Sequence, residues 1–351
     1  MEYLNKIINI ANVYIELGYW PSIKTSISII IPKSNKKSYD IPKTFRLIVL
    51  LNTLGKLIEK VIGKKLQFQV LSKEFIHSCQ LGGLKQHSTV DADIVLIYLI
   101  HVEWVKNYLT SILAFNVTQF FPSLNLLLLS LILNKVGFNS RVSHFFENYL
   151  VGRKTKYFWN NFSSSYFDIN IGVGQGSALS SILSALYLSL IFHVFEKRLK
   201  ILKIPVLVLY FVNNSLFIAQ SKSLHISNSN LFCSYHIMSL LLDQFSLVIE
   251  HGKTKVFHFS RSHSIFNPPP LDLSLLGKSV FQPKENWKYL DFIFDWKLSF
   301  HQHVDFYTNK AISTIKSMKM LGNSSKGLIS FQKHLLYRLY ILLIVLYRFP
   351  L

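Results

Sequence analysis

The sequence contains little cysteine, few acidic residues and no long apolar run, and each shortage argues against a class of protein. Cys79 and Cys233 are the two cysteines among 351 residues, and they form no spacing motif. A disulfide framework is therefore not expected, and an intracellular protein is the default expectation. The pair His301 and His303 is too isolated to predict a zinc site.

Acidic residues are outnumbered by basic residues. The chain has 18 Asp and Glu against 38 Lys and Arg, which gives a formal net charge of +20. A surplus of this size on a globular chain favours a polyanionic partner, with nucleic acid as the leading candidate. An anionic membrane surface is the competing candidate, and the positive mean hydropathy of +0.29 keeps it open.

Apolar runs are too short to cross a membrane. The run 124–133 is short, and the run 335–346 is interrupted by Arg338. A spanning helix needs about 20 apolar residues, and the N-terminus lacks the plan of a signal peptide. Half of the residues are nevertheless apolar, including 28 Phe and 17 Tyr. This composition argues against disorder and predicts a sizeable core.

The most informative stretch is 206–218, where strand-forming apolar residues flank Asn213 and Asn214. Asn tolerates positive φ, so the pair predicts a tight turn in a β-hairpin. Two stretches upstream are interpreted together with this hairpin. Residues 114–123 have the sequence AFNVTQFFPS, and residues 172–180 have the sequence GVGQGSALS.

In this order, the three stretches resemble motifs A, B and C of reverse transcriptases of the LINE type (non-LTR retrotransposons). The family patterns are FLDVxxAFPSxN, GxxQGSxLSP and Y/FVDD. Asn116, Asn213 and Asn214 stand where each family Asp is expected. The resemblance covers roughly residues 27–350.

The resemblance implies an α+β right-hand polymerase fold, with fingers, a palm built on an antiparallel sheet, and the start of a helical thumb. Its expected segments are an N-terminal helical extension at 1–26, fingers at 27–112, a palm with motifs A to D at 113–266, and a motif E hairpin with a partial thumb at 267–351. A helix over 50–69 with an apolar face and a lysine stripe is predicted from three-four spacing. Ser88 and Asp91 predict a capping box for the next helix.

The resemblance also implies roles for single residues. The expected nucleotide-binding residues are Lys33, Arg46, Phe121, Gln175 and Gly176. The expected primer and template contacts are Trp287, Tyr289 and Leu290, and Lys253 matches the motif D lysine that assists proton transfer. Taken alone, the basic residues also fit a solvated surface, and Phe121 also fits an ordinary core aromatic.

The family chemistry uses two Mg²⁺ ions, an RNA template, a DNA primer and deoxynucleoside triphosphates. Three Asn in place of three Asp would take the metal site from a formal charge of −3 to 0. We therefore expect no productive metal binding and an inactive polymerase domain. The alternative function is a non-catalytic module that binds RNA or DNA, and the oligomeric state is left open.

Overall fold

The computed structural model describes residues 2–20, 24–34, 36–84, 87–138, 140–261, 268–277, 279–318 and 327–347. The helical elements are α1 (Glu2–Leu17), η1 (Pro42–Thr44), α2 (Thr53–Ser72), α3 (Thr89–Val105), α4 (Phe120–Ser123), α5 (Leu126–Lys135), α6 (Ser140–Leu150), α7 (Ser180–Ile201), α8 (Leu224–Gln244), η2 (His251–Lys253), η3 (Ser274–Leu276), α9 (His301–Met318), α10 (Ser330–Leu336), η5 (Tyr337–Ile341) and α11 (Leu342–Val345). The strands are β1 (Thr25–Pro32), β2 (Phe45–Leu51), β3 (Leu109–Asn116), β4 (Arg153–Trp159), β5 (Phe162–Ser163), β6 (Phe167–Ile169), β7 (Val206–Phe211), β8 (Asn214–Ser221), β9 (Lys255–Phe259), β10 (Leu271–Asp272), β11 (Val280–Phe281), β12 (Asn286–Tyr289) and β13 (Phe292–Asp295). The expected α+β class is confirmed.

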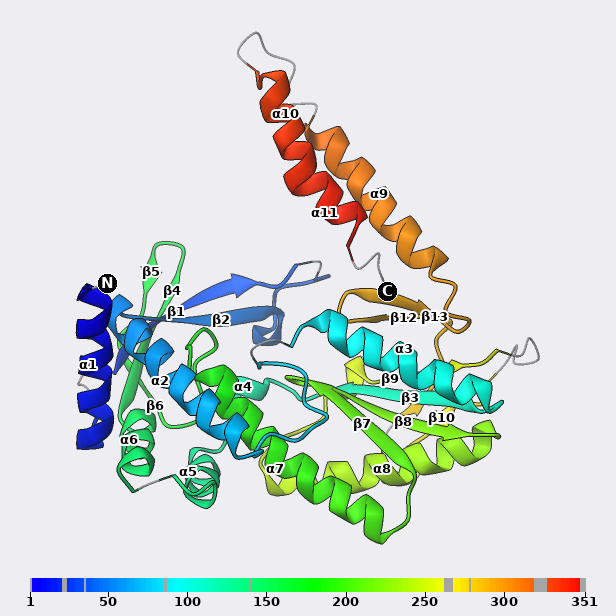
Figure 1. The fold of residues 1–351 in the computed structure, drawn as a ribbon, viewed down its shortest axis with the longest axis horizontal. Coiled ribbons are helices and arrows are strands. Elements are labelled where there is room, and N and C mark those ends of the chain that lie inside the picture. The colour runs from blue at the N-terminus through cyan, green and yellow to red at the C-terminus, as the bar shows by residue number, and fades with distance from the viewer. Residues whose placement is uncertain are drawn as a thin grey trace.

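The central sheet is antiparallel, with strand order β7-β8-β3-β9. Its side chains alternate between two cores, since Leu113 and Phe115 belong to one apolar cluster and Ile112 to the other. Helices α7 and α8 cover the first face, while α3 and the β12–β13 hairpin cover the second (Figure 1). Both faces are therefore buried, and the candidate residues Asn116 and Asn214 lie at the end of the sheet.

A second sheet has the order β2-β1-β4-β5, with β6 paired to β4. Strands β1 and β4 run parallel, and the other pairs are antiparallel. The buried hydroxyls of Ser28 and Thr155 lie 2.8 Å apart across the parallel pair. This sheet takes strands from both sides of the expected boundary at 112/113.

Helix α2 differs in detail from its prediction. Leu50 and Leu51 belong to β2, and the helix begins after Asn52, whose side chain accepts a hydrogen bond from the Leu54 N–H at 2.9 Å. The buried face of α2 carries Glu59, whereas Leu57 is exposed. The next helix, α3, begins with the capping box that Ser88 and Asp91 predict.

The C-terminal helices stand apart from the two sheets. Helix α9 and the run α10–η5–α11 lie side by side as a protruding pair (Figure 1). The expected segment boundary at 266/267 lies outside the described residues. Among the helices in the described ranges, none is long and apolar enough to cross a bilayer.

Candidate active site and nucleic-acid interface

The β7–β8 hairpin turns at Val212 and Asn213 rather than at the expected pair Asn213 and Asn214. Asn214 is the first residue of β8, where it pairs with Phe211 of β7 on one side and with Asn116 of β3 on the other. Val212 has φ +57, and Asn213 does not have positive φ. Positive φ at the first turn residue alone is the type II′ pattern, which normally uses glycine there.

The three amides gather at one end of the sheet. Asn116 ends β3 in register with Asn214, and the Val117 N–H donates to the Asn213 carbonyl at 3.3 Å. All three residues are half-buried. No hydrogen bond joins their side chains to any residue in the described ranges.

The side chains of Asn116, Asn213 and Asn214 bring no charge to this end of the sheet. Mg²⁺ is usually held by carboxylates and phosphates, and an amide oxygen brings no charge. Within the ranges that the structure describes, no group of three or more His, Cys, Asp or Glu is placed to hold a metal. The residues present therefore do not fit a pair of Mg²⁺ ions.

The segment 79–83 supports the hairpin from the β7 edge. The Leu81 N–H donates to the Tyr210 carbonyl at 3.0 Å, and the Tyr210 N–H donates to the Cys79 carbonyl at 3.2 Å. Gly82 lies against the turn, because a Cβ atom there would be 2.5 Å from the Val212 nitrogen. Any side chain at position 82 would therefore displace the turn.

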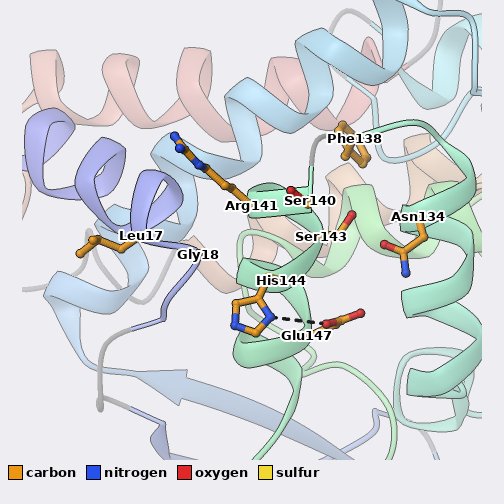
Figure 2. Close-up of a pocket in the computed structure, with 9 residues that line it drawn as sticks. All are labelled: Leu17, Gly18, Asn134, Phe138, Ser140, Arg141, Ser143, His144 and Glu147. Atoms are coloured by element: carbon orange, nitrogen blue, oxygen red, sulfur yellow. Dashed lines mark ion pairs between the residues drawn. The ribbon is translucent and has the colours of Figure 1, made fainter.

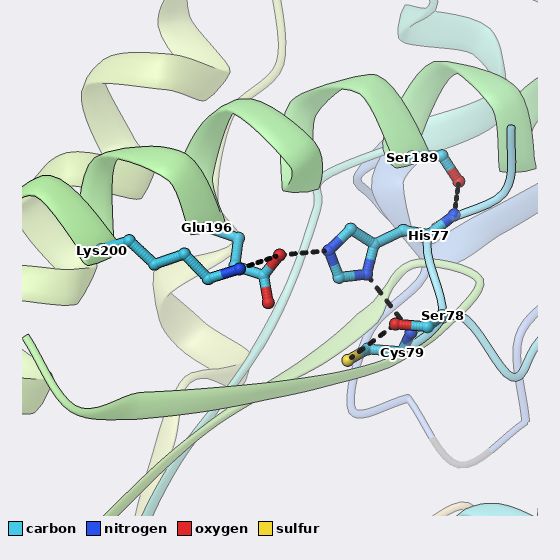
Figure 3. A network of polar contacts seen from close by, with 6 residues as sticks. All are labelled: His77, Ser78, Cys79, Ser189, Glu196 and Lys200. Carbon is cyan, nitrogen blue, oxygen red and sulfur yellow. Dashed lines mark hydrogen bonds and ion pairs between the residues drawn. The ribbon is translucent and has the colours of Figure 1, made fainter.

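A buried histidine anchors the same segment to α7 (Figure 3). The His77 N–H donates to Ser189 Oγ at 3.1 Å, and its Nδ1 accepts from the Cys79 N–H at 3.2 Å. Burial lowers the pKa of His77, and His193 lowers it further. The Glu196 carboxylate, 3.5 Å from Nε2, does not outweigh burial. The His77 ring is thus a neutral structural anchor at physiological pH.

The turn at 172–179 packs against β2 and the start of α4. The Val49 N–H donates to the Gln175 carbonyl at 2.8 Å, and the Val173 N–H donates to the Phe121 carbonyl at 2.8 Å. Gly176 has φ +116, and a Cβ atom there would be 2.9 Å from the Val49 carbonyl oxygen. The structure thus packs Gln175 and Gly176 against β2 and holds Phe121 at the start of the same turn.

A buried carboxylate holds the end of this turn. Glu59 of α2 is fully buried, and it accepts hydrogen bonds from the Tyr149 hydroxyl at 2.7 Å and from the Ala178 N–H at 3.0 Å. Burial raises the pKa of Glu59 more than these hydrogen bonds lower it. At the other end of the turn, Arg153 donates to the Gly172 carbonyl at 2.6 Å. The sequence analysis did not single out Glu59, although it is an acidic residue on the apolar face predicted for this helix.

The expected cations Lys33, Arg46 and Lys253 are brought together. Burial lowers the pKa of Lys33, and Lys253 and Arg46 lower it further, while Glu250 raises it. The Glu250 carboxylate pairs with Lys253 at 2.8 Å and with Lys43 at 3.2 Å. Burial raises the pKa of Glu250, but the two lysines outweigh it and the net shift is downward. Sequence reasoning singled out neither Lys43 nor Glu250, because charge alone names no partner.

The lysine stripe of α2 faces the turn at 172–179. A cavity of about 580 Å³ is lined by Lys56, Lys60 and Lys64 on one side and by Gly176 and Ser181 on the other. Lys65 instead donates to Asn12 of α1. Three of the four lysines of α2 therefore line the cavity beside the motif residues.

Another cavity, of about 620 Å³, lies away from these motifs between α1 and α6 (Figure 2). Arg141, His144 and Glu147 line it, and His144 Nδ1 lies 3.7 Å from the Glu147 carboxylate. None of the residues expected from the sequence to act in a site lines this cavity.

The motif E hairpin turns at Leu290 and Asp291, both with positive φ. The Trp287 and Tyr289 rings stack 4.9 Å apart, and both side chains are buried. Of the three expected primer contacts, Leu290 alone presents a half-exposed side chain. Burial instead places Trp287 and Tyr289 in the core beneath the hairpin.

Comparison with known proteins agrees with this geometry. The family model described as "Reverse transcriptase (RNA-dependent DNA polymerase)" matches residues 31–294. No curated protein matches the sequence.

Among solved structures, the chain is similar to three telomerase structures from yeasts of the genus Candida. The apo telomerase of Candida tropicalis truncated from its C-terminal domain gives a TM-score of 0.53 at 14% identity, over 80% of this chain and 55% of that chain. The Candida albicans telomerase in complex with a TWJ fragment of telomeric RNA gives 0.51 at 14% identity, over 84% and 52%. The Candida tropicalis telomerase in the equivalent complex gives 0.53 at 13% identity, over 91% and 53%. The expected right-hand polymerase fold is confirmed, and the chain spans about half the length of these telomerases.

Proposed function

Because the chain belongs to the reverse transcriptase (RNA-dependent DNA polymerase) family, we propose that it is a LINE-type domain that has kept the fold but lost catalysis. The observation that supports this proposal is the cluster of Asn116, Asn213 and Asn214 at the end of the central sheet. These are the positions where the motifs expect the metal-binding Asp residues.

Electrostatics gives the expected size of the loss. Two unit charges about 4 Å apart interact by about 4 kcal/mol at an effective dielectric constant of about 20. Exchanging three carboxylates for amides removes such attractions for both metals. Since each 1.36 kcal/mol of barrier is about tenfold in rate, we expect polymerisation to fall by many orders of magnitude.

A second candidate function is non-catalytic binding of RNA or DNA. It is favoured by the cavity where Lys56, Lys60 and Lys64 face Gly176, and by the net charge of +20. Lysines along a groove hold a phosphate backbone by releasing counterions, and this needs no metal. An RNA template, a DNA primer and a deoxynucleoside triphosphate are the proposed partners.

A primer-extension assay with an RNA template and Mg²⁺ tests the loss of catalysis. We expect no incorporation by the wild-type chain, and a gain in the variant Asn116→Asp/Asn213→Asp/Asn214→Asp. The matched control, Asn5→Asp/Asn160→Asp/Asn309→Asp, adds the same charge at exposed positions and is expected to stay inactive. Robust incorporation by the wild-type chain contradicts the proposal.

A further inference from the structure

Glu250 lies directly beside the amide cluster. Its N–H donates to the Asn116 carbonyl at 2.7 Å, and the next pair, Val117 and Ile249, forms an antiparallel bridge. Residues opposite each other in antiparallel strands project from the same face. Glu250, Asn116 and Asn214 therefore form a row across neighbouring strands, with a carboxylate at one end.

The carboxylate of Glu250 is bound by two of the surrounding cations. Its side chain is 13% exposed, while the side chains of Lys43 and Lys253 are 54% and 52% exposed. The Lys33 ammonium donates to the Lys43 carbonyl at 2.7 Å, which brings a third cation to the group. Two cations, Lys43 and Lys253, therefore contact the carboxylate, and Lys33 lies next to them.

The exposed halves of Lys43 and Lys253 leave room for a second anion. Each ammonium carries three donors, and Glu250 uses only part of them. A ligand with one phosphate must share these lysines with a carboxylate that is already in place. A ligand with several phosphates can contact Lys33, Lys43 and Lys253 at once and displace the carboxylate.

We propose that Glu250 is a built-in counterion, which occupies the phosphate position of this cationic cluster and restricts it to polyphosphate ligands. The inference rests on the proposed function, because it takes the cluster to be the phosphate-binding part of the site. Glu250 thereby lowers the affinity for all phosphate ligands. Relative to the charge of the ligand, the loss is largest for ligands with a single phosphate.

Calorimetric titration with sodium tripolyphosphate, in low salt with EDTA, tests this role. Replacing the carboxylate by an amide in Glu250→Gln is expected to tighten tripolyphosphate binding about tenfold, since a repulsive charge a few ångström away is removed. The matched control Asp168→Asn removes one carboxylate from an exposed ion pair, 3.7 Å from Lys154, and should leave the affinity within about twofold. Unchanged or weaker binding in Glu250→Gln overturns the proposal.

Further variants separate the charge of Glu250 from its packing. Glu250→Ala also removes the charge, keeps the N–H that Asn116 accepts, and must show the same gain. Adding Lys253→Gln to Glu250→Gln must remove the gain, whereas persistence of the gain counts against the cluster as the binding site. Orthophosphate must bind the wild-type chain more weakly than tripolyphosphate does.

Binding of an RNA–DNA duplex, measured on the same proteins, distinguishes the two proposals. If the wild-type chain binds duplex normally and Glu250→Gln shows no gain for tripolyphosphate, the counterion inference alone fails. If Glu250→Gln gains affinity for tripolyphosphate and neither protein binds duplex, the nucleic-acid-binding function alone fails.

Discussion

Val212 carries backbone strain at the point where the site is formed. A β-branched residue at φ +57 is disfavoured, and such conformations cost about 1–3 kcal/mol. The surrounding backbone stabilises the strained turn, because Gly82 packs against it and Tyr210 is bonded to the segment 79–81. The amides of Asn213 and Asn214 are thus presented by a rigid turn.

At the residue scale, His258 is expected to make folding sensitive to acid. It is buried in β9, its Nδ1 lies 2.8 Å from Ser111 Oγ, and burial lowers its pKa to about 4. The folded chain then binds fewer protons than the unfolded chain between about pH 6.5 and pH 4. The stabilisation is complete above pH 6.5 and is lost as the pH falls, by about 3 kcal/mol at 1.36 kcal/mol per pKa unit.

Urea unfolding at pH 7, 5.5 and 4 measures this contribution. In His258→Gln, the loss of unfolding free energy between pH 7 and pH 4 should be smaller by about 3 kcal/mol than in the wild-type chain. His225→Gln changes an exposed histidine and should retain the wild-type dependence. An unchanged dependence in His258→Gln rules out His258 as the source.

At the element scale, α2 connects the lysine groove to the turn at 172–179. Its buried face places Glu59 against Ala178 and Tyr149, and its exposed face carries Lys56, Lys60 and Lys64. One helix therefore positions both the candidate nucleic-acid surface and the motif turn. Movement of α2 would change both together.

Glu59→Ala is expected to destabilise the chain by about 1–3 kcal/mol, because it leaves the buried Tyr149 hydroxyl and the Ala178 N–H without this acceptor. The exposed control Glu285→Ala should stay within about 0.5 kcal/mol. Urea unfolding measures both, and hydrogen exchange at the Ala178 amide should accelerate only in Glu59→Ala. Equal stability of the two variants would show that the buried carboxylate does not hold the turn.

Glu59 also has a pH dependence of its own. Because its pKa is raised in the folded chain, its contribution to stability is complete below the unfolded pKa of about 4.5 and is lost as the pH rises through the folded pKa. Glu59→Gln removes this titration. Its unfolding free energy should therefore fall less than that of the wild-type chain as the pH rises above 4.5, in the same urea experiments.

At the scale of the whole molecule, the fold brings basic residues from several segments next to the motif residues. The lysines of α2 and the cations around Glu250 come from segments far apart in the sequence, and both groups border the turn or the amide cluster. Long-range attraction by the net charge adds to these local contacts.

The variant Lys56→Gln/Lys60→Gln/Lys64→Gln should bind single-stranded RNA more weakly, with a smaller salt dependence. Losing three phosphate contacts should reduce the slope of log K against log salt by about 2. The control Lys135→Gln/Lys203→Gln/Lys222→Gln removes the same charge from exposed positions outside the cavity and should reduce it much less. Filter binding from 50 to 300 mM salt distinguishes them, and equal slopes would mean that only net charge matters.

Local sequence patterns were sufficient to predict several secondary-structure elements and the family. The hairpin, the α2 and α3 helices, the capping box of Ser88 and Asp91, and the family follow from the sequence, because spacing, capping chemistry and motif order are local properties. The turn lies at Val212 and Asn213, one residue before the predicted pair. The pairing of Asn214 with Asn116 takes precedence over the intrinsic preference of Asn for turns.

The sequence by itself determined that three amides stand where the motifs expect carboxylates, because residue identity fixes charge. Only the tertiary structure decided that Glu250 pairs with Lys43 and Lys253, and that Glu59 is buried against the motif turn. Partners of this kind depend on distances between segments that are remote in the chain. Charge and burial at such contacts are set by packing, which no local pattern encodes.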